Sequence, residues 1–364
     1  MGLQVGIVGL PNVGKSTLFN AVSAAGAEAV NYPFATIEPN VGVVAVPDER
    51  LATVARLAGS RRAVPTSVEL LDIAGLVRGA STGEGLGNQF LGHIRSVDAI
   101  VHVVRCFDDA DVVHVDGSVD PARDIDVVET ELLLKDLETV ERRAERVARS
   151  ARSGDKGATR EAEVAGSLAT HLQAGLPART FTGADGQALA GELGLLTAKP
   201  VLYAANVGEA DLAAGGGHHV DAVRAVAEKE GADVVAICAE AEAQIAELPP
   251  AERGEFLAAL GLQRSGLDRL ATAAYGLLRL ITFFTTGPKE SRAWTVTDGT
   301  PAQQAAGRVH SDMQRGFIRA EVISFDDYAA LGSEQAVRDQ GRLRVEGRDY
   351  VVRDGDVIRF RFNV

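Results

Sequence analysis

Short apolar runs alternate with helical patterns over the first 240 residues of the chain. The runs lie near residues 3–8, 41–46, 66–71, 98–107, 200–205 and 233–237. Between them, apolar side chains recur at helical spacing, as in 16–25, 47–57 and 219–230. Runs that are apolar throughout are typical of strands buried on both faces. The alternation therefore predicts an α/β domain built on a mainly parallel sheet.

One crossover in this series is much longer than the others. A single helix would return the chain within about 30 residues, but the strand-like run that ends at residue 107 is followed by the next one only at residue 200. Apolar residues recur at helical spacing within this gap, at Ile125, Val128, Leu132, Leu133, Leu137 and Val140. A second helical stretch covers 160–173, after a break at 154–157. The gap predicts an inserted helical hairpin.

The pattern changes again near residue 280. Strand-like runs follow at 280–285, 293–297, 317–325, 341–345, 348–352 and 356–362, with one helical run at 301–312. A short mixed sheet around one helix predicts a β-grasp module, which serves either as a binding module or as a folded spacer. The predicted organisation is an α/β domain from 1–119 and 197–279, the helical hairpin from 120–196, and the third domain from 280–364.

The candidate chemistry begins directly after the first strand. Residues 9–16, Gly-Leu-Pro-Asn-Val-Gly-Lys-Ser, fit the G-x-x-x-x-G-K-[ST] phosphate-binding loop, with a strand before them and a helix after them. Backbone N–H groups and the positive end of the helix would face the phosphates. The residues expected to bind the nucleotide here are Asn12, Val13, Gly14, Lys15, Ser16 and Thr17. Lys15 would reach the β- and γ-phosphates, and the Ser16 hydroxyl would hold Mg²⁺.

Two further positions are expected to act at the γ-phosphate. Thr36 lies in the loop 31–40 between the first helix and the second strand, where nucleotide switches place a second Mg²⁺ ligand; an ordinary loop threonine is the alternative. Asp72 ends the third strand and starts a D-x-x-G pattern that ends at Gly75. Asp72 could hold Mg²⁺ directly or through water, and the backbone N–H of Gly75 could approach the γ-phosphate closely.

The base-binding region follows the strand at 200–205. Residues 206–209 are Asn-Val-Gly-Glu, where guanine-specific switches carry Asn-Lys-x-Asp. Glutamate for aspartate and valine for lysine disrupt the guanine reader, whereas the amide of Asn206 is able to pair with adenine. Val207 belongs to the same segment, and Cys238 and Ala239 follow the last strand, where the backbone offers a contact to the base. These residues favour ATP over GTP.

Composition narrows the choice of partners and compartment. No apolar run is long enough to span a bilayer, so no membrane partner is expected. Cys106 and Cys238 lie in apolar strand-like runs, which indicates buried thiols and a reducing cytoplasm. The net charge of −13 argues against broad binding to polyanions, and no DNA partner is expected. Between residues 142 and 160, however, Lys and Arg clearly outnumber the acids; this patch could meet RNA phosphate or be a solvated helix end.

Together these motifs make the chain resemble the Obg-like ATPases, the YchF subfamily of translation-factor-related P-loop NTPases. The matching segments are 9–17, 31–40, 72–88 with Phe90 and Leu91, 206–209, 240–242 and 354–358, so that the resemblance covers essentially the whole chain. It implies a nucleotide-binding domain, an inserted helical coiled-coil domain and a C-terminal TGS (ubiquitin-like) domain. It also implies ATP hydrolysis in preference to GTP, and association with ribosomes.

The residue after the D-x-x-G pattern bears on the rate of hydrolysis. It is Leu76, where many switches carry a glutamine that orients water, so hydrolysis is slow or another group supplies that function. The resemblance to the Obg-like ATPases implies the same, since these proteins resemble other switches that carry an apolar residue at this position. Asn12 sits where related cation-dependent switches bind K⁺ beside the phosphates, and His114, in the loop 108–120, could swing in to position water. A loop-shaping asparagine and a surface histidine are the alternatives.

The leading hypothesis is a slow ATPase whose nucleotide state gates docking to the ribosome, either its large subunit or the whole particle and its RNA, in translation or stress regulation. The cofactors would be Mg²⁺ and, at Asn12, K⁺. An Obg-type GTPase of ribosome assembly is a second hypothesis, in which Glu209 does the work of aspartate. A third is a binding scaffold that nucleotide stabilises and in which turnover is incidental.

Overall fold

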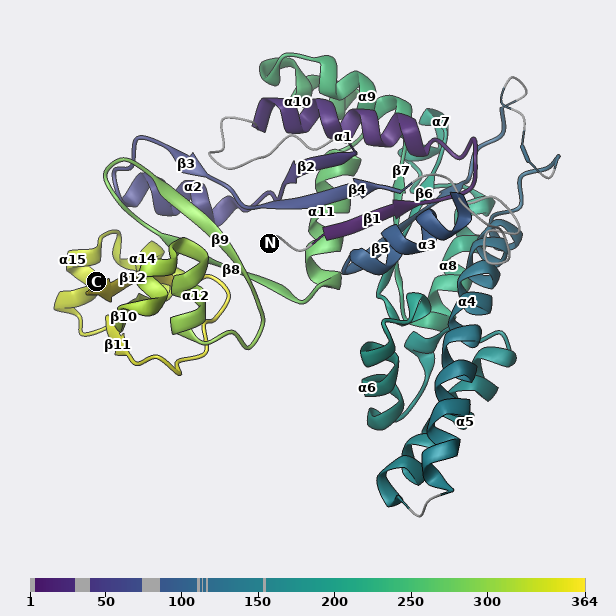
Figure 1. Cartoon of the computed structure of the whole chain (residues 1–364). Coiled ribbons are helices and arrows are strands. Elements are labelled where there is room, and N and C mark those ends of the chain that lie inside the picture. The colour runs from purple at the N-terminus through teal and green to yellow at the C-terminus, as the bar shows by residue number, and fades with distance from the viewer. Residues whose placement is uncertain are drawn as a thin grey trace. The chain divides into compact units, whose positions relative to one another are not determined.

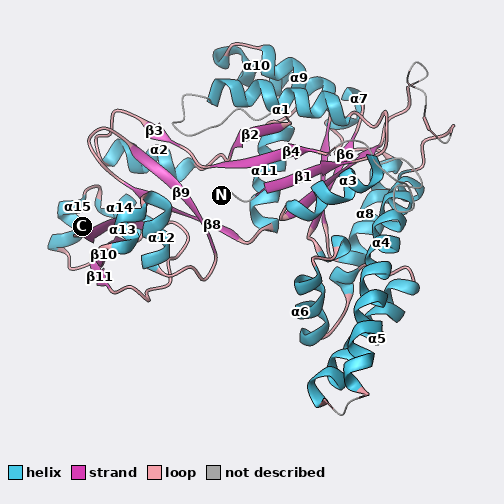
Figure 2. Ribbon diagram, viewed as in Figure 1, coloured by secondary structure: helices cyan, strands magenta, loops and turns pink. Residues whose placement is uncertain are grey.

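The computed structural model describes residues 4–29, 40–73, 86–109, 112, 114–115, 117–152 and 155–363. Figure 1 shows the chain by residue number and Figure 2 by secondary structure. The chain forms two compact units. The first holds the N-terminal segment up to Glu28 and most of the chain from Glu69 to Ala274, and the second holds Val44–Val68 and Tyr275–Val364.

The first unit is built on a six-stranded sheet. Its strands are β1 (Gln4–Val8), β2 (Val41–Ala45), β4 (Ser67–Asp72), β5 (Ala99–Arg105), β6 (Val201–Asn206) and β7 (Asp233–Ile237), in the order β2-β4-β1-β5-β6-β7. The pairs β4–β1, β1–β5, β5–β6 and β6–β7 are parallel. Every residue of β5 and β6 is buried, as expected for strands covered on both faces. The α/β fold predicted from the alternation is confirmed.

Helices cover both faces of this sheet. They are α1 (Lys15–Ala29), α3 (Leu86–Ser96), α7 (Glu209–Leu212), α8 (His218–Glu230), α9 (Ala239–Glu247), α10 (Pro250–Ala259) and α11 (Gly266–Leu277). Figure 1 shows α1 on one side of the sheet and α3 and α8 on the other. The first turn of α11 is capped by the buried carboxylate of Glu242, whose oxygens accept from the N–H groups of Gly266 at 2.6 Å and Leu267 at 3.2 Å.

The predicted insertion is a helical arm. It consists of α4 (Pro121–Ala151), α5 (Lys156–Gln173), η1 (Ala178–Thr180), α6 (Ala184–Leu193) and η2 (Leu196–Ala198), with α4 and α5 lying side by side (Figure 1). Asp120 caps α4 and Asp155 caps α5, each by accepting from backbone N–H groups of the first turn. The arm has its own apolar core, formed by Leu133, Val140, Ala165, Leu168, Ala169, Leu172, Ala178, Leu189, Ala190 and Leu195.

A buried carboxylate fixes the return of the arm. Asp136 of α4 is fully buried and accepts from the N–H groups of Leu196 at 2.8 Å and Thr197 at 2.7 Å, and from the Thr197 hydroxyl at 2.7 Å. Burial raises the pKa of Asp136, and these hydrogen bonds oppose the rise. The arm is therefore anchored at its base as well as by its core.

The second unit holds a mixed sheet. Its strands are β3 (Ala63–Val64), β8 (Leu280–Thr285), β9 (Ser291–Thr297), β10 (Phe317–Ile323), β11 (Arg344–Glu346) and β12 (Val357–Phe362), in the order β11-β10-β12-β8-β9-β3. The pairs β8–β9, β10–β12 and β10–β11 are antiparallel, whereas β12–β8 and β3–β9 are parallel. One face of the sheet packs on α12 (Ala302–Val309). This arrangement fits the predicted β-grasp module.

Two details of the third predicted domain are wrong. Residues 348–352 do not form a strand; Val351 makes only an isolated bridge with Pro301. One helix was expected, but the described residues also form α13 (Ser311–Arg315), α14 (Phe325–Leu331) and α15 (Glu334–Asp339). The helices α14 and α15 are only about two turns long, and their start signals are the single capping residues Ser324 and Ser333, which periodicity does not detect.

Residues 44–68 belong to the second unit, although the sequence analysis assigned them to the nucleotide-binding domain. They form α2 (Glu49–Leu57) and β3. Leu51 and Val54 of α2 pack against Phe284 and Val357 in an apolar core on the second face of the sheet. Arg50 donates to Asp354 at 2.7 and 3.2 Å. These contacts join residues more than 200 positions apart, so no local pattern indicates them.

None of the helices in the described part of the chain combines the length and the apolar character needed to cross a membrane.

Candidate nucleotide site

The candidate site is a cavity of about 740 Å³ in the first unit. It is lined by segments that follow four strands: residues 10–12 and 14–17 after β1, 107–109 and 112 after β5, 206–208 at the end of β6, and 238–240 after β7. Val13, which the sequence predicts to bind nucleotide, is buried and is not among the described residues that line the cavity. From β1 the sheet runs one way to β4 and β2 and the other way to β5, β6 and β7. The cavity thus opens at the carboxyl ends of the strands, at the point where strand order reverses, where open α/β sheets bind ligands.

The geometry of the predicted phosphate loop explains its glycines. A Cβ on Gly9 would lie 2.7 Å from the carbonyl oxygen of Val103 in β5, so the loop could not approach the sheet with a larger residue. Gly14 has φ +90°, and its Cβ would lie 2.1 Å from Nδ2 of Asn206. Asn12 also adopts a positive φ of 63°, which asparagine tolerates better than most residues. The helix α1 begins at Lys15, so its N-terminal N–H groups point to the cavity.

Lys15, which lines the cavity, forms an ion pair with Asp72 at the end of β4, which is not among the described residues of the lining. The pairing Ile7↔Asp72 between β1 and β4 places the end of β4 beside the phosphate loop. Ser16 is exposed and lines the cavity, and Asp72 is partly exposed, so a hydroxyl and a carboxylate oxygen are both available. Oxygen ligands of this kind fit Mg²⁺. With nucleotide and metal bound, Lys15 would turn to the phosphates and Asp72 to the metal or its water.

Asn206 links two of the cavity's segments. Its Nδ2 donates to the carbonyl of Val13 at 2.9 Å, and its Oδ1 accepts from the N–H of Ala239 at 3.0 Å. The side chain is buried, and these two bonds hold the phosphate loop against the segment that follows β7. From the sequence, this amide is expected to read adenine. The structure gives it an architectural role that the motif alone does not reveal.

The segment after β5 forms a wall of the cavity, although none of its lining residues is among those that the sequence predicts to bind nucleotide. Phe107, Asp108, Asp109 and Val112 line the cavity. Arg105, the last residue of β5, is buried, and its guanidinium donates to the carbonyls of Phe107 at 3.1 Å, Asp109 at 3.2 Å and Val112 at 3.0 Å. The sequence did carry one sign of this wall, because Arg105 is a charged residue at the end of an otherwise apolar run that is typical of a buried strand.

The segment after β6 contributes some of its residues to the cavity and not others. Val207 is buried and lines the cavity, as does Gly208. Glu209 begins α7 as an exposed residue and is not among the described residues that line the cavity. Cys238, Ala239 and Glu240 line it from the other side.

His114 lies against the first turn of α4, away from the cavity lining. Its Nε2 is 2.8 Å from Oδ2 of Asp124, and the side chains are 7% and 2% exposed. His114 is not among the described residues that line the cavity. A role in positioning water would require it to leave Asp124. Thr36, Gly75 and Leu76 lie outside the described residues, so their predicted roles at the γ-phosphate stay predictions.

Burial governs the ionisable groups behind the site. Both cysteines are free and buried, in agreement with the predicted thiols. Burial, and to a lesser degree the charge of Asp124, raises the pKa of Cys106 to about 12; burial also raises the pKa of Cys238. His102 of β5 is buried, and burial together with the charge of Arg179 lowers its pKa to about 3. These groups are therefore neutral at physiological pH.

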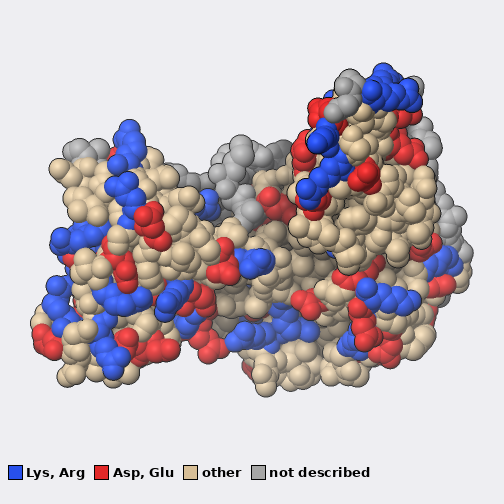
Figure 3. All heavy atoms as spheres, turned by 90° about the horizontal axis from the view of Figure 1, so that it is seen from below, with Lys and Arg blue, Asp and Glu red and all other residues tan. Residues whose placement is uncertain are grey.

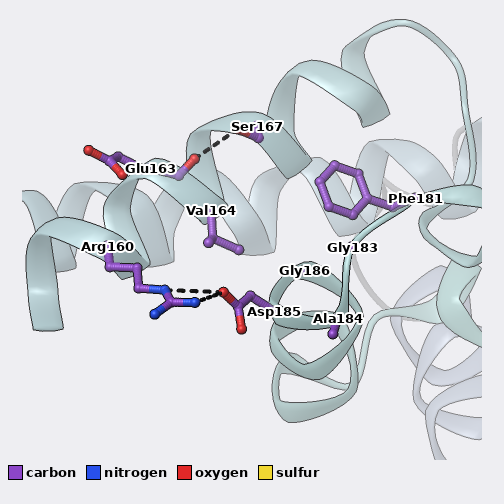
Figure 4. A pocket seen from close by; sticks show the side chains of 9 residues that line it. All are labelled: Arg160, Glu163, Val164, Ser167, Phe181, Gly183, Ala184, Asp185 and Gly186. Carbon is purple, nitrogen blue, oxygen red and sulfur yellow. Dashed lines mark hydrogen bonds and ion pairs between the residues drawn. The ribbon is translucent and has the colours of Figure 1, made fainter.

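A second, more open cavity of about 450 Å³ lies on the arm (Figure 4). Its walls are α5 and the start of α6, with Val164 and the ring of Phe181 facing it. Arg160 and Asp185 pair across its rim, with Arg160 Nη2 and Asp185 Oδ2 2.6 Å apart. This cavity has no phosphate loop, so the larger cavity is the candidate nucleotide site.

A phosphate loop between the first strand and first helix of a parallel sheet, opening at the topological switch point, defines a P-loop NTPase. A family model described as a 50S ribosome-binding GTPase matches residues 4–141. A second model, YchF-GTPase_C, described as a protein of unknown function, matches residues 280–363.

Full-length relatives narrow the class further. The chain is 52% identical to the ribosome-binding ATPase YchF of Bacillus subtilis, with all of both chains covered. It is equally similar to the protein of that name from Escherichia coli O157:H7. The solved structure of the Schizosaccharomyces pombe YchF GTPase matches with a TM-score of 0.90 and 36% identity, covering 99% of this chain and 98% of that one. The chain belongs to the YchF family of P-loop NTPases.

Proposed function

We propose that this protein is a Mg²⁺-dependent ATPase that prefers ATP to GTP and docks on the ribosome as a nucleotide-dependent switch. The observation that carries the base preference is the segment after β6, where Val207 is buried at the cavity and Glu209 is exposed outside it. The relatives at 52% identity are named ribosome-binding ATPases, which supports both the reaction and the partner. The buried free thiols support a reducing compartment, the cytoplasm.

The base preference is tested by measuring the affinities for ATP and GTP side by side with calorimetry. We expect tighter ATP binding in the wild type and a shift toward GTP in the double variant Val207→Lys with Glu209→Asp, because this restores the guanine reader. Glu209→Asp alone, at an exposed position, is the control for folding. Tighter GTP binding by the wild type would favour the Obg-type GTPase instead.

Hydrolysis in this proposal needs help at the γ-phosphate. In this proposal the transferred phosphoryl group would be stabilised by Lys15, Thr36 and Gly75, and Mg²⁺ would be held by Ser16, Thr36 and Asp72. Leu76 cannot orient the attacking water, so K⁺ at Asn12 or a displaced His114 would supply the missing catalytic function. The role of K⁺ at Asn12 is tested by measuring the turnover of the wild type and of Asn12→Ala in K⁺ and in Na⁺. His114→Ala tests the role of His114, since it should lower turnover without weakening ATP binding.

The arm offers a candidate contact to ribosomal RNA. Near its tip, exposed cations from α4 and α5 have no carboxylate partner among the described residues: Arg146, Arg149, Arg152 and Lys156. The other three cations of this patch are paired, Arg142 with Glu138, Arg143 with Glu161 and Glu192, and Arg160 with Asp185. Figure 3 shows Lys and Arg, interspersed with Asp and Glu, at the end of the arm at the upper right. Unpaired cations can release counterions on meeting phosphate.

Co-sedimentation with purified ribosomes, in the presence of ATP or ADP, tests the partner. We expect binding that depends on the nucleotide and weakens for Arg149→Gln with Arg152→Gln. The control is Arg224→Gln with Lys229→Gln, which removes the same charge from exposed positions of α8. If neither ribosomes nor K⁺ stimulate turnover, a scaffold that nucleotide merely stabilises is the better account.

A further inference from the structure

The strands β2 and β4 form a two-stranded ribbon that joins the two units through the chain itself. The N–H of Asp72 donates to the carbonyl of Asn40 at 2.8 Å, where β2 begins and β4 ends. The N–H of Val46 donates to the carbonyl of Thr66 at 2.8 Å, where β2 ends and β4 begins. The two strands therefore run in opposite directions. Both chain crossings that bound the segment 44–68 lie within this ribbon.

The end of the ribbon at Asp72 belongs to the nucleotide site. Asp72 forms an ion pair with Lys15 of the phosphate loop, and a bound nucleotide with Mg²⁺ would give both side chains new partners. Because the N–H of Asp72 is bonded to Asn40, a change at this residue acts on both strands of the ribbon. Among the described strands, β2 is at the edge of its sheet and has β4 as its neighbour. Fewer hydrogen bonds therefore hold β2 in place than hold a central strand.

The other end of the ribbon is fixed within the second unit. The hydroxyl group of Thr66 is hydrogen-bonded to that of Thr295 in β9. Just before Thr66 in the chain, β3 pairs with β9, and the N–H of Ser291 donates to the carbonyl of Arg62 at 2.9 Å. The helix α2 adds its apolar core contacts and the ion pair of Arg50 described above. The ribbon is thus continuous with a segment whose partners lie in the strands and turns of the second unit.

We propose that this ribbon couples the nucleotide site to the second unit. Binding of a Mg²⁺–nucleoside triphosphate changes how α2 and β3 pack, because hydrogen-bonded strands pass a displacement along their length where a free loop would absorb it. Coupling of this kind is reciprocal, so a partner bound to the second unit changes the affinity for the nucleotide by the same factor. The coupling rests on the proposed role of Asp72 at the metal, and it requires neither a particular base nor the ribosome.

Hydrogen exchange of the full chain tests the coupling. The exchange is measured with and without Mg²⁺ and a non-hydrolysable analogue of ATP or GTP, whichever binds more tightly. We expect the amides of α2 and the N–H of Ser291 to exchange about fivefold more slowly with the analogue bound. The amides of α5, in the arm, are the control and should change little. Equal slowing in α5 and α2 would reflect general stabilisation and would contradict the coupling, as would unchanged exchange in α2.

Loosening the attachment of α2 should act back on the metal. Leu51→Ala removes apolar volume from the core that α2 shares with Phe284. Ile358→Ala, the control, removes a similar volume from the core on the α12 face of the same sheet. We expect calorimetry to show about fivefold weaker binding of the Mg²⁺–triphosphate analogue for Leu51→Ala alone, and wild-type affinity for both variants once EDTA has removed the metal. Equal losses in both variants would assign the effect to the stability of the second unit.

A milder variant is available where Leu51→Ala does not fold. Arg50→Gln removes the ion pair with Asp354, and Arg56→Gln, at an exposed position of the same helix, is its control. We expect about twofold weaker binding of the Mg²⁺–triphosphate analogue for Arg50→Gln alone. Equal affinities of the two variants would overturn the coupling.

Asp72→Asn tests the proposed role at the metal separately. If this variant leaves Mg²⁺-dependent binding unchanged, the role of Asp72 in the proposed function fails. The exchange measurement on the wild type still decides whether the nucleotide site and the second unit are coupled.

Discussion

The nucleotide cavity has two halves that are built in different ways. The phosphate half comes from one short stretch, residues 10–12 and 14–17, whose shape follows from Gly9, Gly14 and the start of α1. The base half is assembled from the segments after β5, β6 and β7, which are about 100 and 30 residues apart in sequence. It keeps its shape through two buried polar side chains, Arg105 and Asn206.

This difference indicates where specificity for the nucleotide base could change without loss of the fold. The phosphate half depends on backbone geometry, so we expect substitutions at Gly9 and Gly14 to weaken phosphate binding strongly. The base half depends on side chains that hold carbonyl and N–H groups in place, so substitutions there alter the wall while the phosphate loop persists. Asn206 belongs to both halves, because it joins Val13 to Ala239.

The largest effect is expected from Gly14→Ala in the phosphate half. The new Cβ would overlap Asn206 Nδ2 at 2.1 Å, at a φ of +90°. We expect about a hundredfold weaker binding of ATP and of inorganic triphosphate alike, since strain and overlap together cost roughly 3 kcal/mol. Gly166→Ala in α5, with open space around its Cβ, is the control and should leave binding unchanged. Calorimetric affinities would decide; unaltered triphosphate binding would contradict the role given to Gly14.

Asn206→Asp should break the link between the halves. An oxygen would replace the Nδ2 that donates to the Val13 carbonyl, leaving two acceptors face to face in a buried site. We expect about thirtyfold weaker binding, equal for ATP and GTP, since an unsatisfied buried group costs roughly 2 kcal/mol. Asn20→Asp, on the exposed side of α1, is the control. A loss confined to ATP would instead show that Asn206 reads adenine.

Arg105→Met should affect the base half alone. The variant keeps an unbranched side chain of considerable volume but loses the hydrogen bonds to the carbonyls of Phe107, Asp109 and Val112. We expect about tenfold weaker ATP binding, because the wall of the cavity loosens. Inorganic triphosphate should bind as in the wild type, and Arg105→Lys should recover part of the loss. Equal losses for ATP and triphosphate would mean that Arg105 supports the whole site.

His102, in the same strand as Arg105, is expected to affect stability and not nucleotide binding. Its folded-state pKa of about 3 lies below the ordinary 6.5. Between pH 6.5 and pH 3 the unfolded chain therefore takes up a proton at this histidine that the folded chain does not. Stability should therefore be full above about pH 6.5 and should fall by about 1.4 kcal/mol per unit as the pH is lowered toward 3.

In His102→Phe this dependence should be absent. Hydrogen exchange of the β5 amides at pH 5 and pH 7, corrected for intrinsic rates, provides the measurement. The expected wild-type loss between these conditions is about 2 kcal/mol. A variant that retains the wild-type dependence on pH would assign the proton uptake to another group.

The sequence predicted the parallel sheet, the helical arm and the phosphate loop, because each leaves a local signal. Apolar runs marked the strands, helical spacing marked α4 and α5, and the loop motif lies in one contiguous stretch. The same reasoning could not place α2 and β3 in the second unit, since the partners of Leu51 and Arg50 lie at Phe284 and Asp354. The strand predicted at 348–352 is absent, because the apolar pattern of these residues finds no partner strand and only Val351 forms an isolated bridge with Pro301.

The sequence alone was enough to predict a phosphate-binding loop at residues 9–16, because glycines at fixed spacing dictate backbone conformation within a few residues. The other walls of the cavity depend on the tertiary structure. Parallel pairing brings the ends of β5, β6 and β7 to one edge, and only there do Arg105 and Asn206 find the carbonyl and N–H groups that they hold. Hydrogen bonds between distant segments are satisfied by the folded arrangement as a whole, and no stretch of sequence specifies them alone.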